Sequence, residues 1–277
     1  MPTLPTIQTD PTAGVLTPTN SVLPLEGRHA LVTGGGSGIG AAITRALLAA
    51  GANVTVLGRR LSVVQLLAAE QPERLHAVSA DVSDAAPVAA AFDSARERFG
   101  PVAILVNNAG QAGSAPFLKI DAQLWQQMMG VNLTGTLLCT QAALPDMLAA
   151  GWGRVVNVAS TAGLAGYAYV AAYCAAKHGV IGLTRALALE VAKKGITVNA
   201  VCPGYTETDI LLDSIQNVIA KTGRGETEAR AQFAAGNPQG RLVQPDEVAD
   251  AVHWLCGVGA ASVHGQSIAV CGGELMQ

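Results

Sequence analysis

Short apolar runs alternate with longer amphipathic segments from residue 29 onward. The runs are rich in Val, Ile and Leu, which is typical of strands that a parallel sheet buries on both faces. They predict strands at residues 30–33, 53–57, 75–79, 103–107, 154–159, 197–202 and 267–270. The segments between them predict helices at residues 39–50, 62–70, 85–99, 122–149, 171–194 and 245–256.

This alternation predicts the fold class. Strands separated by helices form βαβ units, whose right-handed crossovers lead to a doubly wound α/β fold with one seven-stranded parallel sheet. We place this Rossmann-type domain at residues 25–277. Residues 204–240 are the least periodic and more polar. We interpret them as a mobile insertion over a site, with a substrate lid at residues 205–240.

Residues 1–24 differ in composition from the rest. They hold six Thr and five Pro, with no Lys or Arg. We expect a disordered or loosely packed extension, and no secretory signal, because a basic start and an apolar block are both missing. Windows 122–145 and 155–176 lack charges but carry polar residues and glycines, so we expect buried or subunit-interface helices, not membrane spans.

Charge and cysteine usage narrow the function classes. The 277 residues are 50% hydrophobic and 13% charged, with a net charge of −3. That balance provides no basic surface for nucleic acid or an anionic membrane. The five cysteines are scattered without C-x-x-C spacing, and no histidine has metal-ligand spacing. We therefore expect a cytoplasmic protein with neither disulfides nor a metal site.

Residues 155–177 contain the most distinctive chemistry. A Val-rich strand leads to Ser160, and the helix that follows carries Tyr173 and Lys177 on one face, four residues apart. A nearby ammonium is expected to lower a tyrosine's pKa from about 10 towards a value useful in acid–base catalysis. The alternative is an amphipathic helix with a packed tyrosine and a surface lysine.

A glycine-rich turn follows the first predicted strand. Its sequence is TGGGSGIG at residues 33–40, and it runs directly into a helix. Glycines allow the backbone to approach a pyrophosphate, and the helix N-terminus offers free N–H groups. After the first strand of a βαβ unit, this pattern predicts a dinucleotide site.

The spacing T-G-x-x-x-G-x-G resembles that of the short-chain dehydrogenase/reductase family, in its single-domain branch. The resemblance extends over residues 26–274. It includes NNAG at 107–110, Asn132, the Ser160/Tyr173/Lys177 set and PGYTET at 203–208. These matches in order favour catalysis over the packed-tyrosine alternative.

The resemblance implies a role for each matched residue. Tyr173 would be the general acid in reduction and the base in oxidation, and Lys177 would lower its pKa and hold the nicotinamide ribose. Ser160 would bind the substrate oxygen, and Asn132 would keep a water in a proton relay. Asn107 is expected to tie neighbouring strands together.

The expected nucleotide contacts lie at the ends of successive strands. Asn108 would face the adenosine ribose, Thr206 and Thr208 the carboxamide, and Asp81 the adenine, although Asp81 is equally plausible as a helix-capping carboxylate. The full expected set is Gly34, Ser37, Gly38, Ile39, Gly40, Arg59, Asp81, Val82, Asn108, Gly110, Tyr173, Lys177, Pro203, Thr206 and Thr208.

Cofactor choice depends on the end of the second strand. Gly58 stands where an acidic residue would select NAD, and Arg59 and Arg60 follow. An arginine suits the 2′-phosphate, so we favour NADP(H). NAD(H) stays open because Ser37 stands where many NADP-dependent relatives carry a basic residue, and because an arginine can simply stack on adenine.

The substrate is less constrained. Residues following strand ends should face it, and they are small, apolar or neutral: Gln111, Ser114, Thr161, Leu164, Tyr167 and Tyr205. The chain resembles β-ketoacyl-thioester and polyketide ketoreductases most, and 3-hydroxybutyrate-type dehydrogenases next. Lys221 and Arg224 could meet a phosphate-bearing coenzyme A or acyl-carrier thioester, and a solvated loop explains them equally well.

The expected function is hydride transfer between a nicotinamide and a secondary alcohol or ketone, such as a 3-oxoacyl thioester. The first alternative is an NAD-dependent dehydrogenase of a small hydroxy acid or alcohol. An epimerase or dehydratase of the same fold and a non-catalytic nucleotide-sensing protein are further alternatives. Family resemblance suggests a homotetramer, with residues 122–149 and 171–194 forming one interface.

Overall fold

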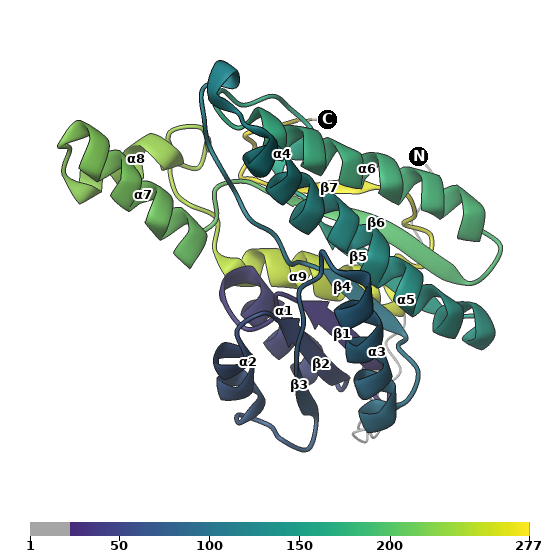
Figure 1. The fold of residues 1–277 in the computed structure, drawn as a ribbon. Helices are drawn as coiled ribbons and strands as arrows, with labels where there is room; N and C mark the ends of the chain where they lie inside the picture. Colours follow the sequence, from purple (N-terminus) through teal and green to yellow (C-terminus); the bar gives the residue numbers. More distant parts are fainter. Residues whose placement is uncertain (1–22, 277) are drawn as a thin grey trace, which may run out of the picture.

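A computed structural model describes residues 23–276. The strands pair in parallel in the order β3-β2-β1-β4-β5-β6-β7, which confirms the predicted doubly wound sheet (Figure 1). They are β1 (His29–Thr33), β2 (Asn53–Gly58), β3 (Leu75–Ser79), β4 (Ile104–Asn107), β5 (Gly153–Val158), β6 (Ile196–Pro203) and β7 (Ser267–Val270). Strand order reverses between β1 and β4, the point where such sheets bind ligands.

The helices cover both faces of the sheet. They are α1 (Gly38–Ala49), α2 (Leu61–Ala68), α3 (Ala85–Phe99), α4 (Ala122–Met129), α5 (Gly135–Ala150), α6 (Ala171–Val191), α7 (Asp209–Thr222), α8 (Glu226–Ala234) and α9 (Pro245–Cys256). Helices α1, α2 and α9 share one apolar cluster with the sheet, and α3, α5 and α6 share another.

Alternation along each strand explains the two clusters. In β1, Val32 packs into the cluster beneath α1 and α9, whereas its neighbour Leu31 packs towards α3 and α5. Both side chains are completely buried. Because successive side chains of a strand point to opposite faces, a strand buried on both sides must be apolar throughout. That requirement is why the strands could be recognised in the sequence.

The segment expected as one helix over residues 122–149 contains a break. Helix α4 passes through a π-helical turn, η2 (Gly130–Thr134), before α5 begins. The Asn132 side chain lies in this turn, and its Nδ2 donates to the Met128 carbonyl at 3.0 Å. A side chain that competes for a backbone carbonyl loosens the helical ladder, and such π-turns are frequent at functional sites.

The insertion at residues 204–240 is more regular than expected. It contains helices α7 and α8, which project from one side of the molecule (Figure 1). Leu211 and Ile215 on α7, Ala229 on α8 and Leu242 form a separate apolar cluster between them. The helices therefore pack mainly on each other, outside the two large clusters of the sheet.

The extension expected at residues 1–24 lies outside the described residues up to residue 22. Leu25 is buried, and its N–H donates to the carbonyl of Ala50 at 2.9 Å. No described helix is both long and apolar enough to cross a membrane. All five cysteines are buried free thiols.

Candidate active site

A deep cleft lies along the carboxyl ends of β1, β2, β4, β5 and β6. Its volume is about 1390 Å³. Small-molecule pockets have volumes of roughly 300–1,000 Å³, so the cleft has room for a dinucleotide together with a second molecule. The residues expected as nucleotide contacts all line it, as do Ser160 and every expected substrate-pocket residue except Leu164. Leu164 packs against the apolar cluster around Ala159 and Ile181 instead.

The glycine loop leaves backbone exposed at one end of the cleft. Gly34 and Gly38 adopt positive φ angles of 63° and 51°, which favour glycine. A Cβ on Gly38 would approach the Thr208 methyl to 3.1 Å. Ser37 precedes α1 without capping it through its side chain, so the N–H groups of the first turn remain available. The loop therefore fits a pyrophosphate, and with it a nicotinamide dinucleotide.

The NNAG segment holds this loop in place. The Asn108 amide donates to the carbonyl oxygens of Thr33 and Gly34 at 3.0 and 3.1 Å. The Thr33 hydroxyl in turn accepts from the backbone N–H groups of Asn108 and Ala109. Asn107 is buried and donates to the Asn157 side chain on β5 at 2.8 Å, which confirms that it ties neighbouring strands together.

Asp81 and Arg59 border the adenosine end expected from the sequence. The Asp81 carboxylate accepts from the N–H and hydroxyl of Ser83, and these hydrogen bonds lower its pKa. Asp84, not Asp81, caps helix α3. Arg59 also favours the charged form of Asp81, and its Nη1 lies 3.2 Å from the side-chain oxygen of Gln111 when that amide is oriented to accept.

The serine, tyrosine and lysine all line the cleft. Ser160 follows β5; its hydroxyl accepts from the backbone N–H of Ala162 at 3.1 Å and favours the ionised form of the Tyr173 phenol. Lys177, one turn further along α6, is buried beneath; its Nζ lies 5.7 Å from the tyrosine ring centroid and donates to the Val158 carbonyl at 2.9 Å. The helical spacing thus brings the expected groups together.

The Tyr173 pKa differs from the sequence expectation. Burial raises it to about 12, and the influence of the Ser160 hydroxyl only partly opposes this rise. Burial also lowers the Lys177 pKa to about 8. The lysine does not lower the tyrosine pKa below its usual value here because both groups lose solvation, which disfavours the charged form of each. Near neutral pH the phenol therefore carries its proton.

Asn132 lies behind the cleft, outside its lining. Its Nδ2 donates to the Gln111 carbonyl at 3.0 Å, and its Oδ1 accepts from the Gln111 N–H at 3.2 Å. Both Asn132 Oδ1 and Lys177 Nζ border Gly110, where a Cβ would meet them at 2.9 and 3.6 Å. The π-turn therefore places the amide beside the lysine.

Several lining residues had not been expected. Phe233 from α8 and Asp209 and Asp213 from α7 also line the cleft. Glu274 accepts a hydrogen bond from Tyr167. A helical spacing of apolar residues at 211, 215, 218 and 219 could have revealed α7, but no local pattern marks Glu274. Arg224 does not line the cleft and pairs with Glu228 at 3.3 Å. The Lys221 side chain lies outside the described residues.

Comparison with known proteins assigns the family. Residues 28–218 match the family model described as short chain dehydrogenase. The chain therefore belongs to the short-chain dehydrogenase/reductase family, and with ketoreductases and hydroxy-acid dehydrogenases among its relatives it is an NAD(P)-dependent oxidoreductase of CH–OH groups. Within residues 23–276, no cluster of His, Cys, Asp or Glu could hold a metal ion.

Three relatives illustrate the range of similar proteins. A crystal structure of an actinorhodin polyketide ketoreductase variant with NADPH superposes with a TM-score of 0.86 at 41% identity, over 89% of this chain and 97% of that one. A Streptomyces coelicolor protein with the provisional name ketoacyl reductase is 41% identical over 88% of this chain and 95% of its own. D-beta-hydroxybutyrate dehydrogenase of Cupriavidus necator is 37% identical over 91% of this chain and all of its own.

Proposed function

We propose that this protein reduces a ketone to a secondary alcohol, with Tyr173 as the proton donor, Ser160 as the group that holds the carbonyl oxygen, and NADP(H) as the favoured cofactor. The central supporting observation is that Ser160, Tyr173 and Lys177 line the same cleft as the glycine loop. Bound nucleotide would supply a hydride from C4 of its nicotinamide.

The protonated phenol suits the reductive direction. A reduced carbonyl becomes an alkoxide unless an acid donates a proton, and a phenol with a pKa of about 12 is protonated throughout the neutral range. The Ser160 hydroxyl can hold the same oxygen within reach. Lys177, at a pKa of about 8, remains mostly an ammonium at neutral pH and stabilises the tyrosinate left behind. Asn132 and Gly110, beside Lys177 Nζ, border the proposed route for proton replacement.

Replacing Tyr173 with phenylalanine tests this proposal. With an activated 3-oxo ester or thioester and NADPH, absorbance at 340 nm should show kcat reduced by about 10²–10⁴-fold, the usual range for a general acid. Nucleotide binding, followed by fluorescence, should be retained. The matched control is Tyr169→Phe, because Tyr169 is exposed and outside the lining. An unchanged kcat for Tyr173→Phe would refute the proposed mechanism.

The NADP(H) preference is supported by the end of β2. Arg59 and Arg60 both line the cleft and are exposed, and Gly58 provides no carboxylate to bind a ribose 2′-hydroxyl. Arg59→Glu should reduce kcat/KM for NADPH by about 10–100-fold, with a much smaller change for NADH, because a phosphate loses a charge-assisted partner. Arg60→Glu shows whether the second arginine shares the contact. A wild-type preference for NADH would overturn this assignment.

The alternative is an NAD-dependent dehydrogenase of a small hydroxy acid, in keeping with the D-beta-hydroxybutyrate dehydrogenase relative. We propose further that residues 25–277 form the catalytic domain, with residues 205–240 as its substrate lid and residues 1–24 as an extension outside it. We also propose that the protein is cytoplasmic and forms a homotetramer. Size-exclusion chromatography with light scattering tests the oligomeric state.

A further inference from the structure

Three aromatic rings lie together in the lining of the cleft. They are Tyr167 from the loop before α6, Tyr205 from the end of β6, and Phe233 from α8, and all three line the cleft. The Tyr167 and Tyr205 rings lie 6.5 Å apart at 84°, and the Tyr205 and Phe233 rings 5.1 Å apart at 69°. Edge-to-face contacts of this kind hold the rings as one wall.

A residue near the end of the chain fixes this wall. The Tyr167 hydroxyl donates to Glu274 Oε1 at 2.6 Å, although 107 residues separate them. The Glu274 carboxylate also lies against Gly204 and Gly236, where a Cβ would meet it at 2.9 and 3.5 Å. It therefore touches the loop before α6, the end of β6 and the segment after α8.

The turn that carries Glu274 is itself well defined. The Glu274 N–H donates to the Cys271 carbonyl at 3.2 Å. Gly272 and Gly273 have φ angles of 63° and 92°, and a Cβ on Gly272 would overlap the Asn237 amide. Other residues would strain this backbone, so the turn holds the carboxylate at one place.

The charged group that contacts the wall is the carboxylate of Glu274. Among the described lining residues, the cationic side chains are Arg59 and Arg60, at the end of β2, and Lys177, which lies beneath Tyr173. Asp209 and Asp213 from the start of α7 also line the cleft, and Glu274 adjoins it through Tyr167. A substrate carboxylate beside Tyr167 would meet the like charge of Glu274, and none of the three lining cations is on the segments that form the wall.

Resting on the proposed function, we propose that the Tyr167–Glu274 pair determines specificity, so that the substrates are uncharged ketones carrying a ring or similarly bulky apolar group and free 3-oxo acids are rejected. The aromatic wall supplies apolar surface for the bulky group. The carboxylate keeps the Tyr167 ring in place and repels an acidic substrate. Esters, and thioesters whose acyl part carries no carboxylate, belong to the accepted class, whereas small hydroxy acids do not.

Four matched ketones distinguish the effect of substrate charge from the effect of substrate size. They are ethyl 3-oxo-3-phenylpropanoate and ethyl 3-oxobutanoate, each with its free acid, and kcat and KM are measured for reduction with NADPH and NADH. We expect kcat/KM for the esters to exceed that for the acids by more than about tenfold, mainly through KM, and the phenyl ester to be preferred over the methyl one.

Variants of Glu274 and Tyr167 distinguish a role in substrate specificity from a purely structural role. Glu274→Gln should narrow the ester-to-acid ratio by about fivefold, because one repelling charge is removed. Tyr167→Ala should reduce kcat/KM for the phenyl ester by about tenfold and change the methyl ester much less, whereas Tyr167→Phe should keep the ring preference. Glu97→Gln, an exposed change on α3, is the matched control for Glu274→Gln.

The outcomes distinguish the two proposals. Acids reduced as efficiently as their esters, or ratios in Glu274→Gln and Tyr167→Ala equal to those of the wild type, would overturn the specificity assignment while leaving ketone reduction intact. Absence of reduction of all four ketones with either nucleotide would overturn the proposed function, and this inference with it.

Discussion

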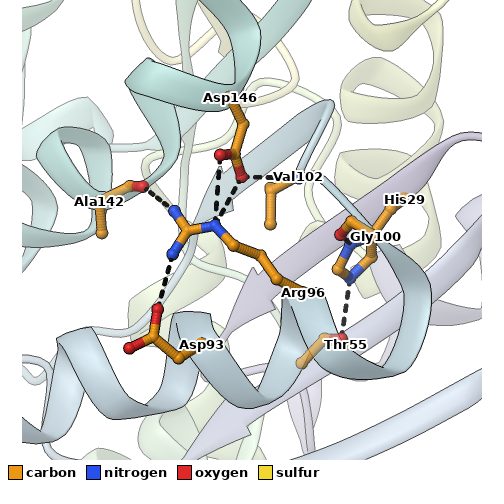
Figure 2. A network of polar contacts seen from close by, with 8 residues as sticks. All are labelled: His29, Thr55, Asp93, Arg96, Gly100, Val102, Ala142 and Asp146. Carbon is orange, nitrogen blue, oxygen red and sulfur yellow. Dashed lines mark hydrogen bonds and ion pairs between the residues drawn. The ribbon is translucent and has the colours of Figure 1, made fainter.

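Asp146 holds three parts of the chain together, and its replacement should measurably destabilise the fold. Its carboxylate accepts from Arg96 Nε on α3 at 2.9 and 3.2 Å and from the backbone N–H of Val102 at 2.9 Å (Figure 2). Arg96 also donates to the Ala142 carbonyl and to Asp93. The network therefore connects α3, α5 and the segment that enters β4.

The magnitude follows from burial. The Asp146 side chain is 16% exposed and that of Arg96 31%. Removing one partner of a fully buried pair costs about 3–5 kcal/mol, and an exposed pair contributes about 0–1 kcal/mol. Asp146→Asn leaves one donor without a good acceptor, but Arg96 keeps two other partners. We therefore expect a loss of about 2–3 kcal/mol, or roughly 4–10 °C in Tm for a domain of this size.

Asp93→Asn is the matched control, because Asp93 contacts the same guanidinium at 3.0 Å but is 71% exposed. Its cost should stay below about 0.5 kcal/mol. Urea unfolding followed by circular dichroism, at fixed protein concentration, measures both variants. Equal destabilisation by the two substitutions would refute the argument that burial sets the strength of this network.

Two other predictions concern the glycine loop and a buried histidine. Gly40→Ala should reduce nucleotide affinity by more than about tenfold, because its Cβ would overlap the Gly34 carbonyl oxygen. The control Gly225→Ala has open space around it, so it should cost less than about 1 kcal/mol in unfolding free energy and leave nucleotide binding unchanged. Titration with NADPH measures both affinities, and equal values would contradict the steric argument. Burial lowers the pKa of His29 below 6.5, so the neutral ring is favoured in the folded state and unfolding free energy should fall as pH drops from 6.5 towards the lower folded-state pKa. His29→Gln should reduce this slope in urea titrations between pH 7.5 and 5, and an identical slope would show that His29 does not contribute.

The sheet was predictable because each strand is recognisable from its own short stretch of sequence. Each strand is buried on both faces, so it must be a short run of apolar residues, and such runs are visible in the sequence. The carboxyl ends of parallel strands meet at one edge, so residues such as Asn108, Ser160 and Thr206 could be assigned to one cleft from their positions after strands. Motif spacing and chain order were sufficient for this much.

Features that depend on distant parts of the chain were not predictable in this way. The contact between Tyr167 and Glu274 joins two residues whose flanking sequences carry no shared pattern. The π-turn at Asn132 arises because a side chain competes for the Met128 carbonyl, and hydrophobic periodicity does not record that competition. Helix α7 is a different case, because its apolar spacing was present but lay within a polar, glycine-containing stretch.

For Tyr173, residue spacing predicted the position of the side chain but not its pKa, which depends on desolvation. Four residues between a phenol and an ammonium place them on one helix face, and from the sequence this arrangement alone suggested a lowered tyrosine pKa. The structure buries Lys177 and half-buries Tyr173, and the lost solvation raises the Tyr173 pKa to about 12 while lowering that of Lys177 to about 8. Burial is the sum of contacts from many segments, including β5 and β6, so it could not be inferred from one helix. The same desolvation keeps the proton on the Tyr173 phenol at neutral pH. A ketone reductase requires this protonated phenol, whereas an alcohol dehydrogenase must first remove the proton.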